Sequence, residues 1–267
     1  MGARALPRAP GLGVRRLYLP VSYWRAAEFA YVWQQLAGLR AARILDVGSP
    51  KDLASFLAAS RGHHVTATDI LPGAVELSRA FAKAQGREGE DIGQISSQVQ
   101  DARHLSYGTD SFDAAYTVSV IEHIPDDGDS LAIAELVRVV KPGGLIVITT
   151  PYDRRYRETF VEGRVYERES AGLTFFERHY DDATIVDRII RASNAELVDL
   201  QHWGELAFSV EAFLARVGRV RTALSPVEGW LAQLNLRRVD PNDTRTHPMA
   251  VFLTLRKPPL AAHVLST

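Results

Sequence analysis

The stretch ILDVGSPKDL, residues 44–53, decides the fold. An apolar run ends in an acid at Asp46, Gly48 follows, and a helix-forming segment begins directly after the glycine. This order of strand, tight turn and helix is typical of the first unit of a parallel α/β sheet. A second apolar run ends in Asp69, twenty-one residues beyond Gly48. Because ligands bind beyond the carboxyl ends of the strands in such sheets, we expect these three residues at one binding edge.

The same alternation of short apolar runs and helical segments continues to residue 150. Strands are predicted at 43–47, 64–69, 94–99, 112–118 and 145–150, with helices at 52–60, 73–85 and 130–140. A helix at 181–192 and strands at 195–202 and 249–256 follow. The pattern predicts an α/β fold with a doubly wound, mostly parallel sheet.

Two segments are too long to be simple connections. Residues 151–180 hold seven aromatic side chains, and residues 204–247 hold two predicted helices, at 208–220 and 226–236. We interpret both as insertions on the substrate side of one domain spanning 21–257, where they form a helical lid or pack against the sheet. Residues 1–20 are expected to form a flexible basic arm, and residues 258–267 a tail.

Composition excludes several classes of function. The formal net charge of −1 argues against a large nucleic-acid interface, which needs a clustered basic face. The absence of cysteine excludes disulfides, thiolate metal sites and a cysteine nucleophile, and eight scattered histidines predict no metal site. No apolar run is long enough for a membrane span. We expect a cytoplasmic protein with a small-molecule substrate, no nucleic-acid partner and no membrane partner.

The acids identify the kind of cofactor. Asp69 lies where an acid can accept both ribose hydroxyls of a nucleoside. Asp46, just before the loop glycine, would repel a pyrophosphate but suits a ligand that carries an ammonium group. The glycine pattern of dinucleotide-binding enzymes is also absent. An NAD-dependent dehydrogenase is therefore disfavoured.

Five motifs in order resemble the class I S-adenosylmethionine-dependent methyltransferases, in particular the small-molecule group related to the ubiquinone and menaquinone enzymes. The motifs lie between residues 40 and 150 and read LDVGS, VTATDI, VQDARHL, FDAAYTVSVIEHI and ELVRVVKPGGLIVITTP. The resemblance implies a Rossmann-like, seven-stranded sheet whose last strand is antiparallel. It also implies transfer of the sulfonium methyl group of S-adenosyl-L-methionine by direct displacement.

The resemblance also implies roles for individual positions. Asp46 and Gly48 correspond to the loop beside the methionine moiety, and Asp69 and Ile70 to the ribose and adenine contacts. Asp101 and Ala102 correspond to the pair that meets the adenine amino group, and Val118 and Ser119 to the strand end beside the amino-acid part of the cofactor.

The glycine loop departs from the family pattern, because Pro50 and Asp52 replace later glycines. Ser49, Pro50 and Asp52 suggest a capping-box-like start of the next helix, with Ser49 as the N-cap. Lys51 is then expected to meet the cofactor carboxylate near the helix N-terminus.

Three residues are candidate bases. A base is needed only where the acceptor loses a proton, as a hydroxyl does. His123 follows the fourth predicted strand, whose carboxyl end faces the transferred methyl group, and His179 and Tyr180 lie in the aromatic insertion. Relatives often use the first histidine to brace a loop instead.

The sequence thus predicts methyl transfer to an oxygen or nitrogen atom, or less favourably a carbon atom, of a small molecule. The alternative is a non-catalytic cofactor-binding or interaction protein with the same fold, for which the altered loop is the argument. The acceptor and the oligomeric state are left open by the sequence.

Overall fold

A computed structural model of the chain describes residues 22–168, 171–206, 209, 210, 213, 216 and 221–259. The predicted arm at 1–20 and most of the tail and of the predicted helix at 208–220 lie outside these residues. Within the described part, no helix combines the length and the apolar character that a bilayer crossing requires.

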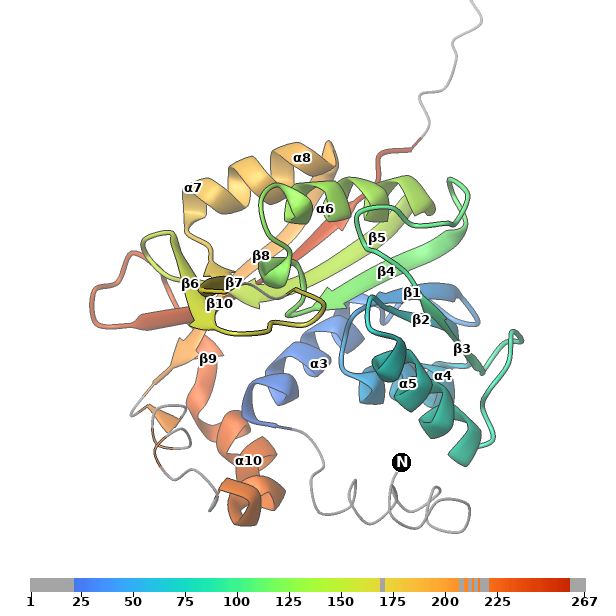
Figure 1. Ribbon diagram of the computed structural model, residues 1–267, viewed down its shortest axis with the longest axis horizontal. Coiled ribbons are helices and arrows are strands. Elements are labelled where there is room, and N and C mark those ends of the chain that lie inside the picture. Colours follow the sequence, from blue (N-terminus) through green and yellow to red (C-terminus); the bar gives the residue numbers. More distant parts are fainter. Residues whose placement is uncertain are drawn as a thin grey trace, which may run out of the picture.

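A central sheet organises the molecule (Figure 1). Its strands lie in the spatial order β3, β2, β1, β4, β5, β10, β8, β9. Their bounds are β1 Arg43–Val47, β2 His64–Asp69, β3 Ile95–Val99, β4 Phe112–Val118, β5 Val140–Pro151, β8 Glu196–Glu205, β9 Leu236–Arg238 and β10 His247–Arg256. The first five strands pair in parallel, and β10 is antiparallel to both β5 and β8.

The seven predicted strands are all present, and an eighth was not foreseen. The short strand β9 pairs antiparallel with β8 at the sheet edge, so the sheet has eight strands rather than seven. Three residues are too few for an alternating pattern to stand out in the sequence.

Helices cover both faces of the sheet. The helices α3 Tyr23–Gln35, α4 Lys51–Arg61 and α5 Pro72–Ala84 lie on one face (Figure 1). The helix α6 Gly128–Val139 and the continuous helical segment α7 Asp182–Thr184, η2 Ile185–Ile190 and α8 Arg191–Ser193 lie on the other. Each face has its own apolar cluster, as a doubly wound sheet requires.

The helix α3 is joined to the late strands along its length. The hydroxyl groups of Tyr31 and of Thr254 on β10 share a hydrogen bond of 2.9 Å, and Gln35 donates to Asp199 on β8 at 3.0 Å. Side chains near the amino end and the carboxyl end of the chain therefore form one side of the core.

The two insertions differ in structure. The first is a hairpin of β6 Arg157–Glu162 and β7 Leu173–His179, so the expectation of helical insertions fails for residues 151–180. The second contains the helix α10 Arg221–Asn235, which packs against α3. Its Glu228 accepts a hydrogen bond from the backbone N–H of Tyr23 at 2.9 Å, at the start of α3. The described side chains of α10 do not line the cavity described below.

Candidate active site

A cavity of about 390 Å³ lies at the carboxyl edge of the parallel strands. Its size is within the range of small-molecule sites. Turns after β1, β2, β3 and β4 form one part of the wall, and the loop between β6 and β7 forms the other. The lining residues that the argument uses are Gly48, Asp69, Asp101, Ser119, His123 and Arg168.

Gly48 brings the backbone close to the cavity directly after β1. Its φ is +66°, in the left-handed region, and its N–H donates to the carbonyl of Thr68 at 2.8 Å. A Cβ at this position would lie 2.8 Å from Cγ1 of Val120. Glycine is therefore required here for two reasons, backbone conformation and space.

We expect Gly48→Ala to lower the free energy of unfolding by roughly 1 to 3 kcal/mol, because it adds a steric clash to an unfavourable φ. Gly143→Ala is the matched control, since Gly143 also has a positive φ, +78°, but nothing within 4 Å of the added Cβ. Urea titration of both variants measures the difference. Equal losses of unfolding free energy in the two variants would show that Val120 moves aside without a measurable loss of stability.

Asp69 forms an ion pair that the sequence did not predict. Its Oδ2 lies 2.9 Å from Nζ of Lys51, and its Oδ1 accepts the backbone N–H of Leu71 at 3.0 Å. Ile70 lines the cavity next to it. Each carboxylate oxygen retains a further lone pair, so Asp69 can still accept ribose hydroxyls.

Asp101 is held in a similar way. Arg103 contacts both of its oxygens, at 2.7 to 3.1 Å, and the Arg103 guanidinium holds the pKa of the Asp101 carboxyl below its usual range. Asp101, Ala102 and Arg103 all line the cavity. The two acids expected to contact ribose and adenine thus face one space, each with a cationic partner.

Asp46 lies behind the cavity wall. It is fully buried, and burial raises the pKa of its carboxyl to about 6. Its Oδ1 accepts the backbone N–H of Ser49 at 3.2 Å, while Oδ2 has no hydrogen-bond partner. Asp46 does not line the cavity. It instead holds the loop of Val47 to Ser49, part of which lines the cavity, through its hydrogen bond with Ser49.

The predicted capping role of Ser49 is wrong. The N-cap of α4 is Pro50, without a side-chain cap, and Lys51 is the first helical residue. The Ser49 hydroxyl instead accepts the backbone N–H of Val118 at 3.0 Å and ties the β1 turn to the end of β4. Lys51 pairs with Asp69 rather than standing free at the helix N-terminus.

Ser119 has a partner that sequence analysis missed. Its φ is +50°, and its hydroxyl donates to Oε1 of Glu28 at 2.7 Å. Glu28 on α3 is 3% exposed and also accepts Thr149 Oγ1 at 2.9 Å and pairs with Arg25 at 2.6 Å. Glu28 lies outside the motifs, and only the docking of α3 brings it to the site.

His123 presents one free ring nitrogen. It lines the cavity, and its Nδ1 lies 2.8 Å from the carbonyl oxygen of Phe176, which can only accept. Nδ1 therefore carries the proton and Nε2 the lone pair. Burial lowers the pKa of His123, which favours the neutral, basic form. A carboxylate oxygen of Glu177 lies 4.0 Å from Nε2 and can stabilise the imidazolium.

His179 and Tyr180 do not line the cavity. Both ring nitrogens of His179 have partners, Arg157 at 3.0 Å and Glu177 at 3.1 Å. Tyr180 is fully buried, and its hydroxyl donates to Asp129 at 2.7 Å. Their placement counts against both as the base, because a base must reach the proton that it removes.

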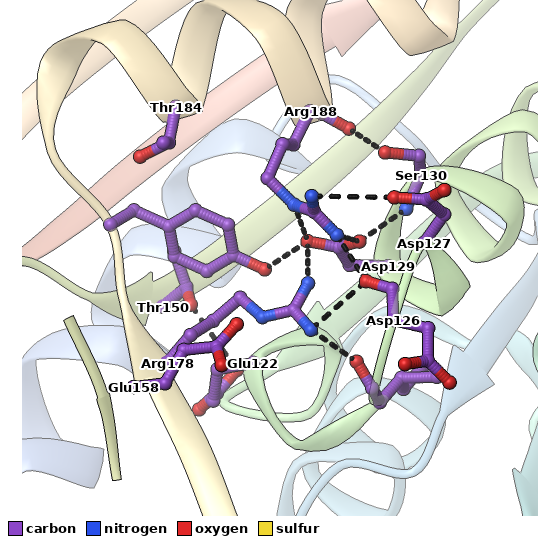
Figure 2. Close-up of polar contacts among 12 residues, drawn as sticks. Glu122, Asp126, Asp127, Asp129, Ser130, Thr150, Glu158, Arg178, Thr184 and Arg188 are labelled. Atoms are coloured by element: carbon purple, nitrogen blue, oxygen red, sulfur yellow. Dashed lines mark hydrogen bonds and ion pairs between the residues drawn. The ribbon is translucent and has the colours of Figure 1, made fainter. Parts of the chain in front are cut away.

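The hydroxyl of Tyr180 donates to a buried ionic cluster that fixes the hairpin to the loop after β4. Figure 2 shows the charged members of this cluster, Asp129, Arg178 and Arg188. Asp129 lies 2.5 Å from Arg178 of β7 and 2.7 Å from Arg188, and Asp129 and Arg178 are both fully buried. Arg178 also donates to the carbonyls of Ile124 and Asp126, at 2.9 and 3.1 Å. Ile124 lines the cavity, so the cluster supports its wall.

Comparisons with known proteins agree with this architecture. Residues 45–148 match a family model described as a methyltransferase domain. The ubiquinone biosynthesis O-methyltransferase of Aeromonas salmonicida is 31% identical over 134 residues, which cover 50% of this chain and 53% of that protein. The chain thus spans about half the length of the curated relatives it matches first.

Solved structures show the same fold. A SAM-dependent methyltransferase from Methanosarcina mazei superposes with a TM-score of 0.55 at 20% identity, covering 83% of this chain and 94% of that one. The [4+2]-cyclase SpnF superposes with a TM-score of 0.58 at 19% identity, covering 89% and 84%. At these identities the likeness concerns the fold.

Proposed function

We propose that the chain transfers a methyl group from S-adenosyl-L-methionine to an oxygen or nitrogen atom of a small molecule, because residues 45–148 match a family model described as a methyltransferase domain. One observation carries the proposal. One cavity is lined by residues from four separate strand ends and by His123. The four residues are Gly48, Asp69, Asp101 and Ser119. We further propose a cytoplasmic protein that does not act on nucleic acid.

The residues present suit this cofactor. All four residues expected to hold the nucleoside line the cavity; we expect Asp69 to accept ribose hydroxyls, Ile70 to contact the adenine ring, and Asp101 with Ala102 to meet its amino group. Gly48 lines the cavity where the resemblance expects the amino-acid part of the cofactor, and its lack of a side chain allows the close approach of the β1 turn to Val120. When bound, the sulfonium supplies an electrophilic methyl group.

The protein itself positions the cofactor and the methyl acceptor, and it removes the proton of a hydroxyl acceptor. The turns after β1 to β4 fix the cofactor site, and the β6–β7 loop closes the acceptor side of the cavity. Much of the rate can arise from this positioning. For a hydroxyl acceptor, Nε2 of His123 takes the proton.

We expect Asp69→Asn to weaken binding of S-adenosylhomocysteine roughly 10- to 150-fold, which corresponds to about 1.5 to 3 kcal/mol for charge-assisted hydrogen bonds. Titration calorimetry measures the affinity. Asp113→Asn is the control, because Asp113 is also a partly buried carboxylate paired with a lysine, Lys141, but does not line the cavity. The proposal fails if the wild-type chain gives no binding heat at millimolar ligand.

A second function is favoured by one feature of the site. Pro50 and Asp52 stand where the loop of the family has glycines, and Pro50 is the N-cap of α4; such an altered loop is compatible with a protein that binds the cofactor without transferring its methyl group. Single-turnover assays with a panel of acceptors separate the two functions: binding without any transfer supports the second.

A further inference from the structure

Arg168 stands apart from the other described residues that line the cavity. It alone among them has a buried polar side-chain atom, Nε, without a hydrogen-bond partner. Among the described residues, the acid within 4 Å is Glu167, whose Oε1 lies 3.8 Å from this nitrogen, beyond hydrogen-bond distance. A buried N–H donor without an acceptor leaves the guanidinium charge incompletely compensated, and the side chain, which is 23% exposed, lines the cavity with its accessible part.

The other ionic groups of the wall satisfy one another. Asp101 and Arg103 make three side-chain hydrogen bonds, and Asp69 is paired with Lys51. The side chain of Glu167 is 43% exposed, so water screens its attraction for Arg168. Among the described residues of the cavity wall, Arg168 therefore has the least neutralised charge.

Arg168 is also held in place before any ligand arrives. Its Nη2 donates to the backbone carbonyl of His123 at 2.9 Å, and its Cζ lies 5.6 Å from the ring centroid of Phe175. These two contacts orient the guanidinium and keep it beside the segment that carries the candidate base. A preorganised guanidinium is well suited to bind a carboxylate.

We propose that Arg168 binds a carboxylate of the methyl acceptor, so that the substrate is a small hydroxy acid whose hydroxyl group lies at His123. This inference rests on the proposed function. In the transfer, the acceptor oxygen forms a bond to the methyl carbon while the carbon–sulfur bond breaks and its electron pair stays on sulfur. The hydroxyl proton moves to Nε2 of His123, and the carboxylate on Arg168 is unchanged.

A matched pair of probes tests the proposal. Salicylate carries a hydroxyl beside a carboxylate, and salicylamide replaces only the carboxylate by a neutral amide. An aromatic probe suits the site because the rings of Tyr166 and Phe176 lie 5.3 and 5.1 Å from that of His123. Both probes are titrated into the full chain, with and without S-adenosylhomocysteine, and Kd is measured by calorimetry.

We expect the wild-type chain to bind salicylate about tenfold or more tightly than salicylamide. Arg168→Met should remove this preference, whereas Arg191→Met, which removes a largely exposed arginine on α8, should keep it. Equal affinities in the wild type, or a preference that survives Arg168→Met, would overturn the inference. Loss of S-adenosylhomocysteine binding alone would count against the proposed function, while the salicylate preference would still decide the role of Arg168.

Discussion

His123→Asn should lower the single-turnover rate of methyl transfer to a hydroxyl acceptor by about 10²-fold or more, with S-adenosylhomocysteine affinity retained. Asparagine can still donate a hydrogen bond to the carbonyl of Phe176, as Nδ1 of His123 does, but it has no basic nitrogen. The variant therefore separates proton removal from support of the loop.

The pH dependence gives an independent check on His123. Its pKa lies below the ordinary value near 6.5 because the ring is buried, and only the neutral ring can accept a proton. The wild-type rate should be constant above that range and fall as the pH drops through the lowered pKa. His123→Asn should lack this acidic limb.

His179→Gln and Tyr180→Phe are the comparison variants for this experiment. Neither side chain lines the cavity, so we expect transfer rates within a few-fold of the wild type. If His123→Asn keeps a normal rate as well, transfer proceeds by positioning alone, and a base is not used.

Asp129→Ala should lower the free energy of unfolding by about 3 to 5 kcal/mol, because it leaves the buried guanidinium of Arg178 without its counter-charge. Asp129 forms ion pairs with Arg178 and Arg188 (Figure 2) and accepts a hydrogen bond from Tyr180. Both Asp129 and Arg178 are fully buried. Urea unfolding, with the slope m checked for constancy, measures the loss.

Asp127→Asn is the matched control for Asp129. Asp127 lies two residues away and also pairs with Arg188, at 3.4 Å, but its side chain is 86% exposed. We expect a change within about 0.5 kcal/mol. A loss for Asp129→Ala as small as that of the control would show that the cluster relaxes or admits water.

The same cluster predicts a direction for acid sensitivity. Burial alone would raise the pKa of Asp129, but hydrogen bonds and charge from Arg188 and Arg178 outweigh it and hold the pKa below its ordinary value. A depressed folded-state pKa stabilises the fold above the unfolded value near 3.9, and this contribution is lost as the pH falls through the folded value. Asp129→Ala should therefore flatten the acid limb of the stability curve.

The sequence predicted those parts of the site that local order determines. Asp69 and Asp101 end or follow strands of one parallel sheet, and parallel strands bring their carboxyl ends to one edge. Both predictions need only the strand positions and the parallel order of the strands, so the spacing of the two acids in the sequence was sufficient to place them at one edge of the sheet. The cofactor contacts of these residues stay predictions.

Partners from distant segments could not be predicted in this way. Glu28 reaches Ser119 only because α3 docks on the sheet, and Arg168 reaches His123 only because the β6–β7 hairpin folds over the loop after β4. Neither pairing leaves a periodic or spaced signal in the sequence. The aromatic content of residues 151–180 suggested an insertion on the substrate side, which lines the site or packs as a small core of its own, but did not indicate its strands.

The predicted cap at Ser49 failed for a related reason. A serine before a proline and a helix satisfies the local rule for an N-cap. In the structure the backbone N–H of Val118, 69 positions away, donates to the same hydroxyl. A tertiary hydrogen bond thus replaced the local one.

The place of β10 between β5 and β8 has a consequence for synthesis on the ribosome. The strand β5 ends at Pro151, but its antiparallel neighbour is complete only at Arg256, 105 residues later. At bacterial or eukaryotic elongation rates this interval lasts roughly 5 to 20 seconds. During that time the β5 edge lacks its final partner, and Tyr31 of α3 cannot yet bond to Thr254. The nascent chain therefore exposes an unpaired strand edge, which is a template for aggregation, after β1 to β5 have emerged and before β10 arrives.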